Sequence, residues 1–273
     1  MRTAQSRWPS ACLRSWIGHQ ARLLACAVCL VVVGLGCGNP SAPSVSRAPA
    51  PSASKSPATV AYIDLPKVEP RTGTAVVIVV DTSGSMAQSV PDASGRMRPK
   101  YQIASEALDR IIQNTAEWKK GHADRPLQLA IYHFASSAAV VLPMAEFDQN
   151  RAQAALKRIP PPNGGTAIGK ALQEAFKALY GSGYTRKFVL CITDGENTVG
   201  PPPDVVGRQL HAQTGGGVEL DFVAFDTSAR QFKFLNNVNG HVVEAADGSQ
   251  LQAELARIYE KRILAEKPDE PQK

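Results

Sequence analysis

The body of this sequence has very little cysteine. Four of the five cysteines lie within the first 37 residues, at positions 12, 26, 29 and 37, and only Cys191 lies further along the chain. A domain that begins after residue 37 therefore has no internal disulfide available. Cys191 lies inside an apolar run and is expected to be a small buried hydrophobe. The Cys26-Ala-Val-Cys29 pair belongs to an apolar leader, so it is not a redox or zinc motif.

An excess of charge of one sign is also missing from most of the chain. The formal net charge is +6, with 30 basic residues against 24 acidic ones. Four of the basic residues lie in an opening stretch without any acid: Arg2, Arg7, Arg14 and Arg22. Without these four, 26 basic residues remain against 24 acids, which is close to balance. A nucleic-acid-binding surface needs a clustered basic excess, so nucleic acid is not an expected partner.

The chain lacks an apolar run long enough for a comfortable membrane span. The segment from Leu23 to Leu35 is almost wholly apolar but short, and with the arginines before it this predicts a signal peptide over residues 1–36. The run ends in Gly34-Leu35-Gly36-Cys37, which resembles the lipobox of bacterial lipoproteins, although Gly34 stands where Leu is usual. We therefore expect lipidation of Cys37 and anchoring to a membrane of the bacterial cell envelope, periplasmic or surface-exposed. An uncleaved anchor or an ordinary secretory signal is the alternative.

The residues after Cys37 form a segment of low complexity. Residues 38 to about 60 are mainly Ser, Ala and Pro, with almost no large apolar side chain. Such a segment buries too little surface to offset the entropy lost on ordering, which predicts a disordered or extended tether. We therefore assign residues 37–70 to the lipidated cysteine and its tether, 71–267 to one globular domain, and 268–273 to a polar tail.

Strand-like and helix-like patterns alternate from about residue 70 onward. Short runs rich in β-branched residues predict six strands, near residues 75–80, 127–134, 138–142, 187–193, 218–225 and 241–244. The third strand follows the second so closely that the two are expected to pair antiparallel. Helical periodicity predicts helices near residues 103–118, 149–159, 167–180, 204–214 and 229–238, and a last one from about residue 249. This order predicts an α/β domain with a mostly parallel six-stranded sheet and helices on both faces.

Oxygen-bearing side chains gather where the predicted strands end. Asp81-Thr82-Ser83-Gly84-Ser85 follows one apolar run, Asp194 follows another, and Thr166 lies in a loop after Gly164-Gly165. Open α/β sheets bind ligands at the carboxyl ends of their strands, so we expect these side chains to converge. Two carboxylates and three hydroxyls form an all-oxygen set suited to a divalent cation, Mg²⁺ in the first place and Mn²⁺ or Ca²⁺ as alternatives. The predicted metal ligands are Asp81, Ser83, Ser85, Thr166 and Asp194.

These motifs resemble the metal-ion-dependent adhesion site of von Willebrand factor A domains, and all five ligand positions of that family are filled here. The resemblance implies a von Willebrand A-type, Rossmann-like fold across the domain. It also implies that Ser83, Ser85 and Thr166 touch the ion, while Asp81 and Asp194 lie nearby, at least one of them acting through water. Neutral hydroxyls leave the ion electrophilic, so the expected further ligand is an exposed Glu or Asp of a partner protein. The expected function is metal-dependent protein binding at the envelope, in adhesion or assembly, without catalysis.

Three alternatives use the same residues. Ser, Thr and Asp commonly cap helices, which accounts for any one of the five alone. A metal-dependent phosphatase or hydrolase would use the same carboxylates, although Ser83 stands where phosphotransferases carry a second acid two residues after the nucleophile. No nucleophile-elbow pattern supports a serine hydrolase. A domain that delivers or regulates an envelope complex, with the metal in a structural role, is the third alternative.

Three further features bear on the function. Residues 164–170 nearly match a phosphate-binding P-loop, but Ala171 replaces the required Ser or Thr and prolines precede the glycines, so no nucleotide is expected. His133 is expected near the carboxyl edge of the sheet as a satisfied core residue. The polar stretch from Met86 to Pro99 is expected beside the metal, where it either recognises a partner or forms a solvated surface loop.

Overall fold

The computed structural model describes residues 62–265. The predicted signal peptide, Cys37, the tether up to residue 61 and the polar tail lie outside the described residues. Within residues 62–265, no helix combines the length and the apolar character needed to cross a membrane.

The core of the domain is a six-stranded sheet. Its strand order is β5 (Ala138–Glu146), β4 (Leu127–Phe134), β1 (Arg71–Asp81), β6 (Tyr184–Thr193), β7 (Glu219–Phe225) and β8 (Gly240–Ala245). All neighbouring pairs are parallel except β4 and β5, which are antiparallel. The predicted mostly parallel six-stranded sheet and its antiparallel pair are therefore confirmed.

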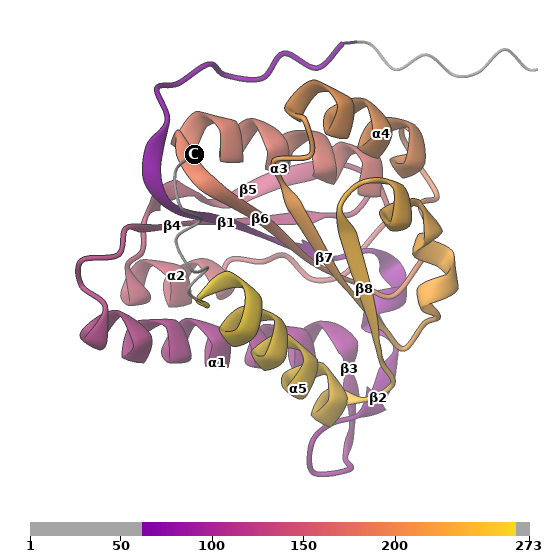
Figure 1. Cartoon of the computed structure of the whole chain (residues 1–273). Helices are drawn as coiled ribbons and strands as arrows, with labels where there is room; N and C mark the ends of the chain where they lie inside the picture. The colour runs from indigo at the N-terminus through magenta and orange to yellow at the C-terminus, as the bar shows by residue number, and fades with distance from the viewer. Residues whose placement is uncertain (1–61, 266–273) are drawn as a thin grey trace, which may run out of the picture. The chain divides into compact units, whose positions relative to one another are not determined.

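Helices cover both faces of this sheet (Figure 1). One face packs against α1 (Lys100–Gly121), α2 (Gln149–Leu156) and α5 (Gly248–Ile258), and the other against α3 (Ile168–Ser182) and α4 (Pro203–Thr214). Strand β1 supplies alternate residues to the two cores: Val76, Ile78 and Val80 face the first set of helices. The intervening residues face the second set. Because both faces are buried, the strand reads as a continuous apolar run rather than an alternating one.

The stretch from Met86 to Pro99 is more ordered than a solvated loop. A short 3₁₀ helix, η1 (Gly84–Ala87), leads into an antiparallel hairpin of β2 (Ser89–Pro91) and β3 (Met97–Pro99). The turn of the hairpin is built around Asp92, whose Oδ1 accepts hydrogen bonds from Ser94 N (2.8 Å), Ser94 Oγ (2.6 Å) and Arg96 N (3.0 Å). An Asp that bonds the backbone after it is a common turn former, so the hairpin is determined locally.

Two predicted helices differ in detail. The predicted helix over residues 229–238 is instead two short 3₁₀ turns, η2 (Ala229–Asn237), separated by a kink at Phe232, whose φ of −107 and ψ of 29 are not helical. The last helix continues beyond α5 as a π turn, η3 (Tyr259–Ile263), in which Leu264 N donates to Tyr259 O at 2.8 Å.

The packed part of the chain begins before the predicted boundary at residue 71. Ile63 is 6% exposed and belongs to the apolar cluster on the α3 face, with Leu65 partly buried against it. These two residues differ from the Ser, Ala and Pro of the predicted tether in having large apolar side chains that gain from burial.

Candidate metal centre

Two neighbouring strands bring the first acid of the site together with a hydroxyl. Strands β1 and β6 are adjacent and parallel, with Val80 paired to Ile192, so Asp81 and Thr193 end the strands side by side. Thr193 Oγ1 donates a hydrogen bond of 2.6 Å to Asp81 Oδ2. Asp81 is fully buried at this carboxyl edge. Its carboxylate is therefore fixed in position by the sheet.

The segment after β1 turns sharply around the Asp81 carboxylate. Ser83 N donates to Asp81 Oδ1 at 2.7 Å, and Ser83 then precedes the 3₁₀ helix η1. Ser83 Oγ lies 3.1 Å from Ser85 Oγ, and Ser85 Oγ donates to Asp194 Oδ1 at 2.7 Å. The structure thus joins Asp81, Ser83, Ser85 and Asp194 in one hydrogen-bonded group of oxygens.

The loop that carries Thr166 lies against this group. Asn163 N donates to Thr82 O (2.8 Å) and Gly84 N donates to Gly164 O (3.0 Å). Gly164 has φ +78, a conformation that favours glycine, and a Cβ there would lie 2.7 Å from Ser136 Oγ. Thr166 is 4% exposed, and its backbone N donates to Thr198 Oγ1 at 2.8 Å. The sequence predicted this convergence of three distant segments.

Burial raises the pKa of Asp81 to about 6, against the lowering effect of the hydrogen bonds from Thr193 and Ser83. The charge of nearby Asp194 adds a smaller raising effect. A divalent cation would supply the opposite charge that Asp81 lacks. The donor set fits such an ion, because carboxylate and hydroxyl oxygens are the ligands that hard divalent cations prefer. Ser85 is half-buried and Gly84 is exposed, so the group is open to solvent on that side.

No group of three or more His, Cys, Asp or Glu side chains suited to a metal occurs within residues 62–265. The candidate site is different in kind, since hydroxyls make up most of its set.

A buried lysine at the site was not anticipated from the sequence. Lys100 Nζ lies 2.8 Å from Asp194 Oδ2 and 3.1 Å from Asp226 Oδ2. The Lys100 side chain is 3% exposed. Nothing local marks this residue, since it follows Arg96 and Arg98 in a polar stretch, and only the fold places it between the two acids.

The other sequence candidates lie outside the oxygen group. His133 Nδ1 lies 3.1 Å from Thr82 Oγ1, and burial lowers the pKa of this histidine, as expected for a satisfied neutral residue. The glycines of residues 164–170 follow a turn rather than a strand, and Lys170 Nζ donates to Ser136 O at 3.2 Å. This is not the strand-to-helix geometry of a P-loop.

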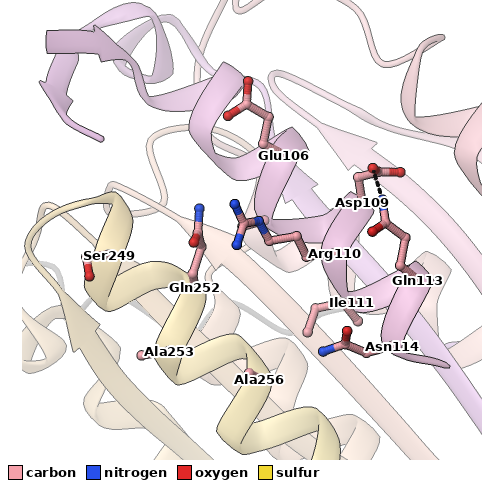
Figure 2. Close-up of a pocket in the computed structure, with 11 residues that line it drawn as sticks. Glu106, Asp109, Arg110, Ile111, Gln113, Asn114, Ser249, Gln252, Ala253 and Ala256 are labelled. Carbon is pink, nitrogen blue, oxygen red and sulfur yellow. Dashed lines mark hydrogen bonds between the residues drawn. The ribbon is translucent and has the colours of Figure 1, made fainter. Parts of the chain in front are cut away.

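A groove of about 790 Å³ runs between α1 and α5 (Figure 2). Its walls are mixed in polarity, with Glu106, Arg110 and Gln252 among the lining residues and a 2.6 Å hydrogen bond from Gln113 Nε2 to Asp109 Oδ2. None of the predicted metal ligands lines this groove.

A family model described as von Willebrand factor type A domain matches residues 76–196. No curated protein sequence is similar enough to this chain to count as a match. Among solved structures, the D319A mutant of the PilB minor pilin from Streptococcus sanguinis has a TM-score of 0.57 at 16% identity, over 71% of this chain and 62% of that one. The von Willebrand factor type A protein from Catenulispora acidiphila has a TM-score of 0.54 at 22% identity, over 68% of this chain and 42% of that one.

A third similar structure is proximal thread matrix protein 1 from the mussel byssus with a zinc-occupied MIDAS motif, at a TM-score of 0.52 and 18% identity. It aligns over 70% of this chain and 48% of that one. This chain therefore spans less than two thirds of each of these three structures, and at such identities the likeness concerns the fold alone. Residues 76–196 match the family model, and the six-stranded sheet and these neighbours show that the described residues have a von Willebrand factor A-type fold.

Proposed function

We propose that this domain binds a divalent cation through Asp81, Ser83, Ser85, Thr166 and Asp194, and uses the ion to hold an acidic side chain of a partner protein. The observation that carries the proposal is the hydrogen-bonded oxygen group: Ser83 Oγ and Ser85 Oγ are 3.1 Å apart, and Ser85 Oγ is 2.7 Å from Asp194 Oδ1. These atoms come from segments more than 100 residues apart. Domains of this family are generally protein-interaction modules rather than enzymes.

The chemistry of the oxygen group supports a hard cation. Carboxylates and hydroxyls suit Mg²⁺ best, with Mn²⁺ and Ca²⁺ as alternatives. A neighbouring fold, the mussel thread matrix protein, has zinc in its MIDAS motif, which supports a divalent ion in this type of site. When bound, the ion would act as a Lewis acid toward an incoming oxygen.

The electrostatics favour an acidic partner. Two carboxylates balance the charge of a divalent ion, but the hydroxyls of Ser83, Ser85 and Thr166 are neutral donors, and Lys100 offsets part of the charge on Asp194. The ion keeps an attraction for one more anion, and the open side at Gly84 and Ser85 gives access. An exposed Glu or Asp side chain on another protein meets both conditions.

We place this interaction at the bacterial cell envelope, with the domain anchored to a membrane through lipid on Cys37. The basic leader, its apolar run and the Gly36-Cys37 pair support the placement. Two neighbours in fold are described as a minor pilin and as an aerotolerance-related membrane protein from Bacteroides fragilis. Mass spectrometry of Cys37 in purified membranes tests the anchor, and an unmodified Cys37 overturns it.

The test of function is a pull-down from envelope extract with the full chain, with and without EDTA. The proposal expects partner capture that EDTA abolishes and that Asp81→Ala or Asp194→Ala removes. The matched control is Asp124→Ala, an exposed acid in the turn before β4, which should capture as much partner as the wild type. Undiminished capture in EDTA contradicts the proposal and favours a metal-structural regulator of an envelope complex. Turnover of a phosphate ester with Mg²⁺ would instead favour the metal-dependent phosphatase.

A further inference from the structure

A lysine is buried at the first residue of α1, next to the candidate metal site. Lys100 Nζ contacts Asp194 Oδ2 at 2.8 Å, Asp226 Oδ2 at 3.1 Å and Gln88 Oε1 at 3.3 Å. The contact with Asp194 is an ion pair rather than a well-directed hydrogen bond. The three contacts come from three different segments of the chain, and the Lys100 side chain is almost completely buried.

This position is unfavourable for a lysine in every respect except its acidic neighbours. Burial costs an ammonium group its hydration, and the N-terminus of a helix repels positive charge. Helix α1 has no acid in its first turn, and Pro99 before it provides no side-chain cap. Burial acts to lower the pKa of Lys100, but Asp194 and Asp226 together raise it above its ordinary value. The side chain therefore stays charged.

The second acid, Asp226, is held in place by an unfavourable backbone conformation. Asp226 follows β7 with φ +54, a left-handed conformation that is uncommon for a residue other than glycine. Its backbone N donates to Ala245 O at 2.7 Å, which ties this turn to the end of β8. The turn brings the Asp226 carboxylate to Lys100, although its side chain stays 44% exposed.

The two oxygens of Asp194 consequently have different partners. Oδ1 accepts from Ser85 Oγ at 2.7 Å, on the side of the candidate metal ligands. Oδ2 faces Lys100. The charge of Asp194, one of the two acids of the candidate metal site, is thus partly neutralised by the Lys100 ammonium group.

We infer that Lys100 couples the two affinities of the site in opposite directions: it weakens the binding of the metal alone and strengthens the binding of an acidic ligand to the loaded site, an inference that rests on the proposed function. A fixed positive charge beside the site repels a divalent cation and attracts any carboxylate that approaches it. The ion alone therefore binds weakly, and an acidic partner restores the affinity. This opposing effect makes Lys100 a specificity-determining residue for anionic ligands.

The test compares the full-length wild type with Lys100→Met, which keeps the length of the side chain and removes the charge. Mn²⁺ binding is measured by calorimetry, and acetate binding to the Mn²⁺-loaded protein by water-proton relaxation. Lys100→Met should bind Mn²⁺ alone more tightly and acetate more weakly. Each dissociation constant should change by roughly fivefold or more, which is the lower end of the usual range for such effects. A merely structural role would weaken both.

A second variant covers the case in which Lys100→Met does not fold. Asp226→Asn removes the more exposed of the two acids, and asparagine tolerates the left-handed backbone well. The charge of Lys100 is then less compensated, so Mn²⁺ should bind more weakly and acetate more tightly, the reverse of Lys100→Met. The matched control is Lys67→Met, which removes an exposed positive charge from the segment before β1 and should change neither affinity.

The outcomes separate the two proposals. Opposite shifts in the two affinities, reversed in Asp226→Asn, support the coupling. Shifts in the same direction, no shifts, or an absence of acetate binding to every loaded protein overturn the coupling while the metal site stands. If the wild type binds no Mn²⁺ at all, the proposed function fails and the coupling fails with it.

Discussion

Replacing Asp81 with asparagine should remove metal binding and yet make the metal-free domain more stable. The Asp81 carboxylate is completely buried, and burial raises its pKa from 3.8 to about 6. The folded state therefore holds this proton more tightly than the unfolded state does. As the pH rises between those two values, the free energy of unfolding falls, and the loss is complete above about pH 6.

The size of the effect follows from the shift. At about 1.4 kcal/mol per pKa unit, the rise from 3.8 to about 6 corresponds to about 3 kcal/mol. Asparagine does not titrate. Its Oδ1 can still accept from Ser83 N, and the Thr193 hydroxyl can rotate to accept from the new amide. Asp81→Asn should thus be more stable than the wild type by about 3 kcal/mol at pH 7.5, with little difference near pH 4.

Urea unfolding in EDTA at the two pH values measures this difference. The control is Asp124→Asn, an exposed carboxylate, which should change the unfolding free energy very little. Adding Mg²⁺ at about 100 times its dissociation constant should then stabilise the wild type by about 2.7 kcal/mol and leave Asp81→Asn unchanged. A variant no more stable than the wild type at pH 7.5 in EDTA would refute the assignment of Asp81 as a buried, uncompensated charge.

Two further predictions concern the scaffold around the site. Gly169→Ala should destabilise the domain by about 1–3 kcal/mol, because the new Cβ would lie 2.1 Å from the backbone oxygen of Pro201. Gly207→Ala should instead stabilise α4 by about 0.5–1 kcal/mol, because its Cβ would meet no atom closer than 3.5 Å. Thermal unfolding of the two variants checks the pair, and equal effects would contradict the steric argument. Arg262→Ala should lower the free energy of unfolding by about 3–5 kcal/mol at neutral pH, because it removes the ion-pair partner of the buried Asp221. In the wild type, Asp221 Oδ1 lies 2.5 Å from Arg262 Nη1. Burial raises the pKa of Asp221 to about 6, so urea unfolding should show a smaller loss at pH 4, and a loss that is the same at both pH values would contradict the prediction.

The strands of the sheet were predictable because their signal is local. The runs that became β1 and β6 are apolar on both faces, as strands covered by helices on each side must be. The antiparallel pair of β4 and β5 followed from the few residues that connect them. The 3₁₀ form of η2 was harder to predict from the sequence, because the burial of Phe232 and Leu235 depends on their packing in the apolar cluster on the α3 and α4 face of the sheet.

The site was partly predictable for a related reason. Asp81, Ser83 and Ser85 lie within five residues of one another at the end of a strand, so their grouping is nearly a local property. Their contact with Asp194 and with the Thr166 loop required the inference that strand ends share one edge of the sheet. The hydrogen bond from Ser85 Oγ to Asp194 Oδ1 bears out that inference for Asp194, and the backbone contacts of residues 163–164 bear it out for the loop.

The order of apolar runs, the turn-forming residues and the positions of the oxygen-bearing side chains belong to the sequence itself, since each depends on neighbours a few residues away. The electrostatic setting of those oxygens belongs to the tertiary structure. Lys100 contacts Asp226, 126 residues later, only because α1 begins at the same edge of the sheet at which β7 ends. Coulomb interactions depend on distance through space and on burial, and the spacing of residues along the chain determines neither of these.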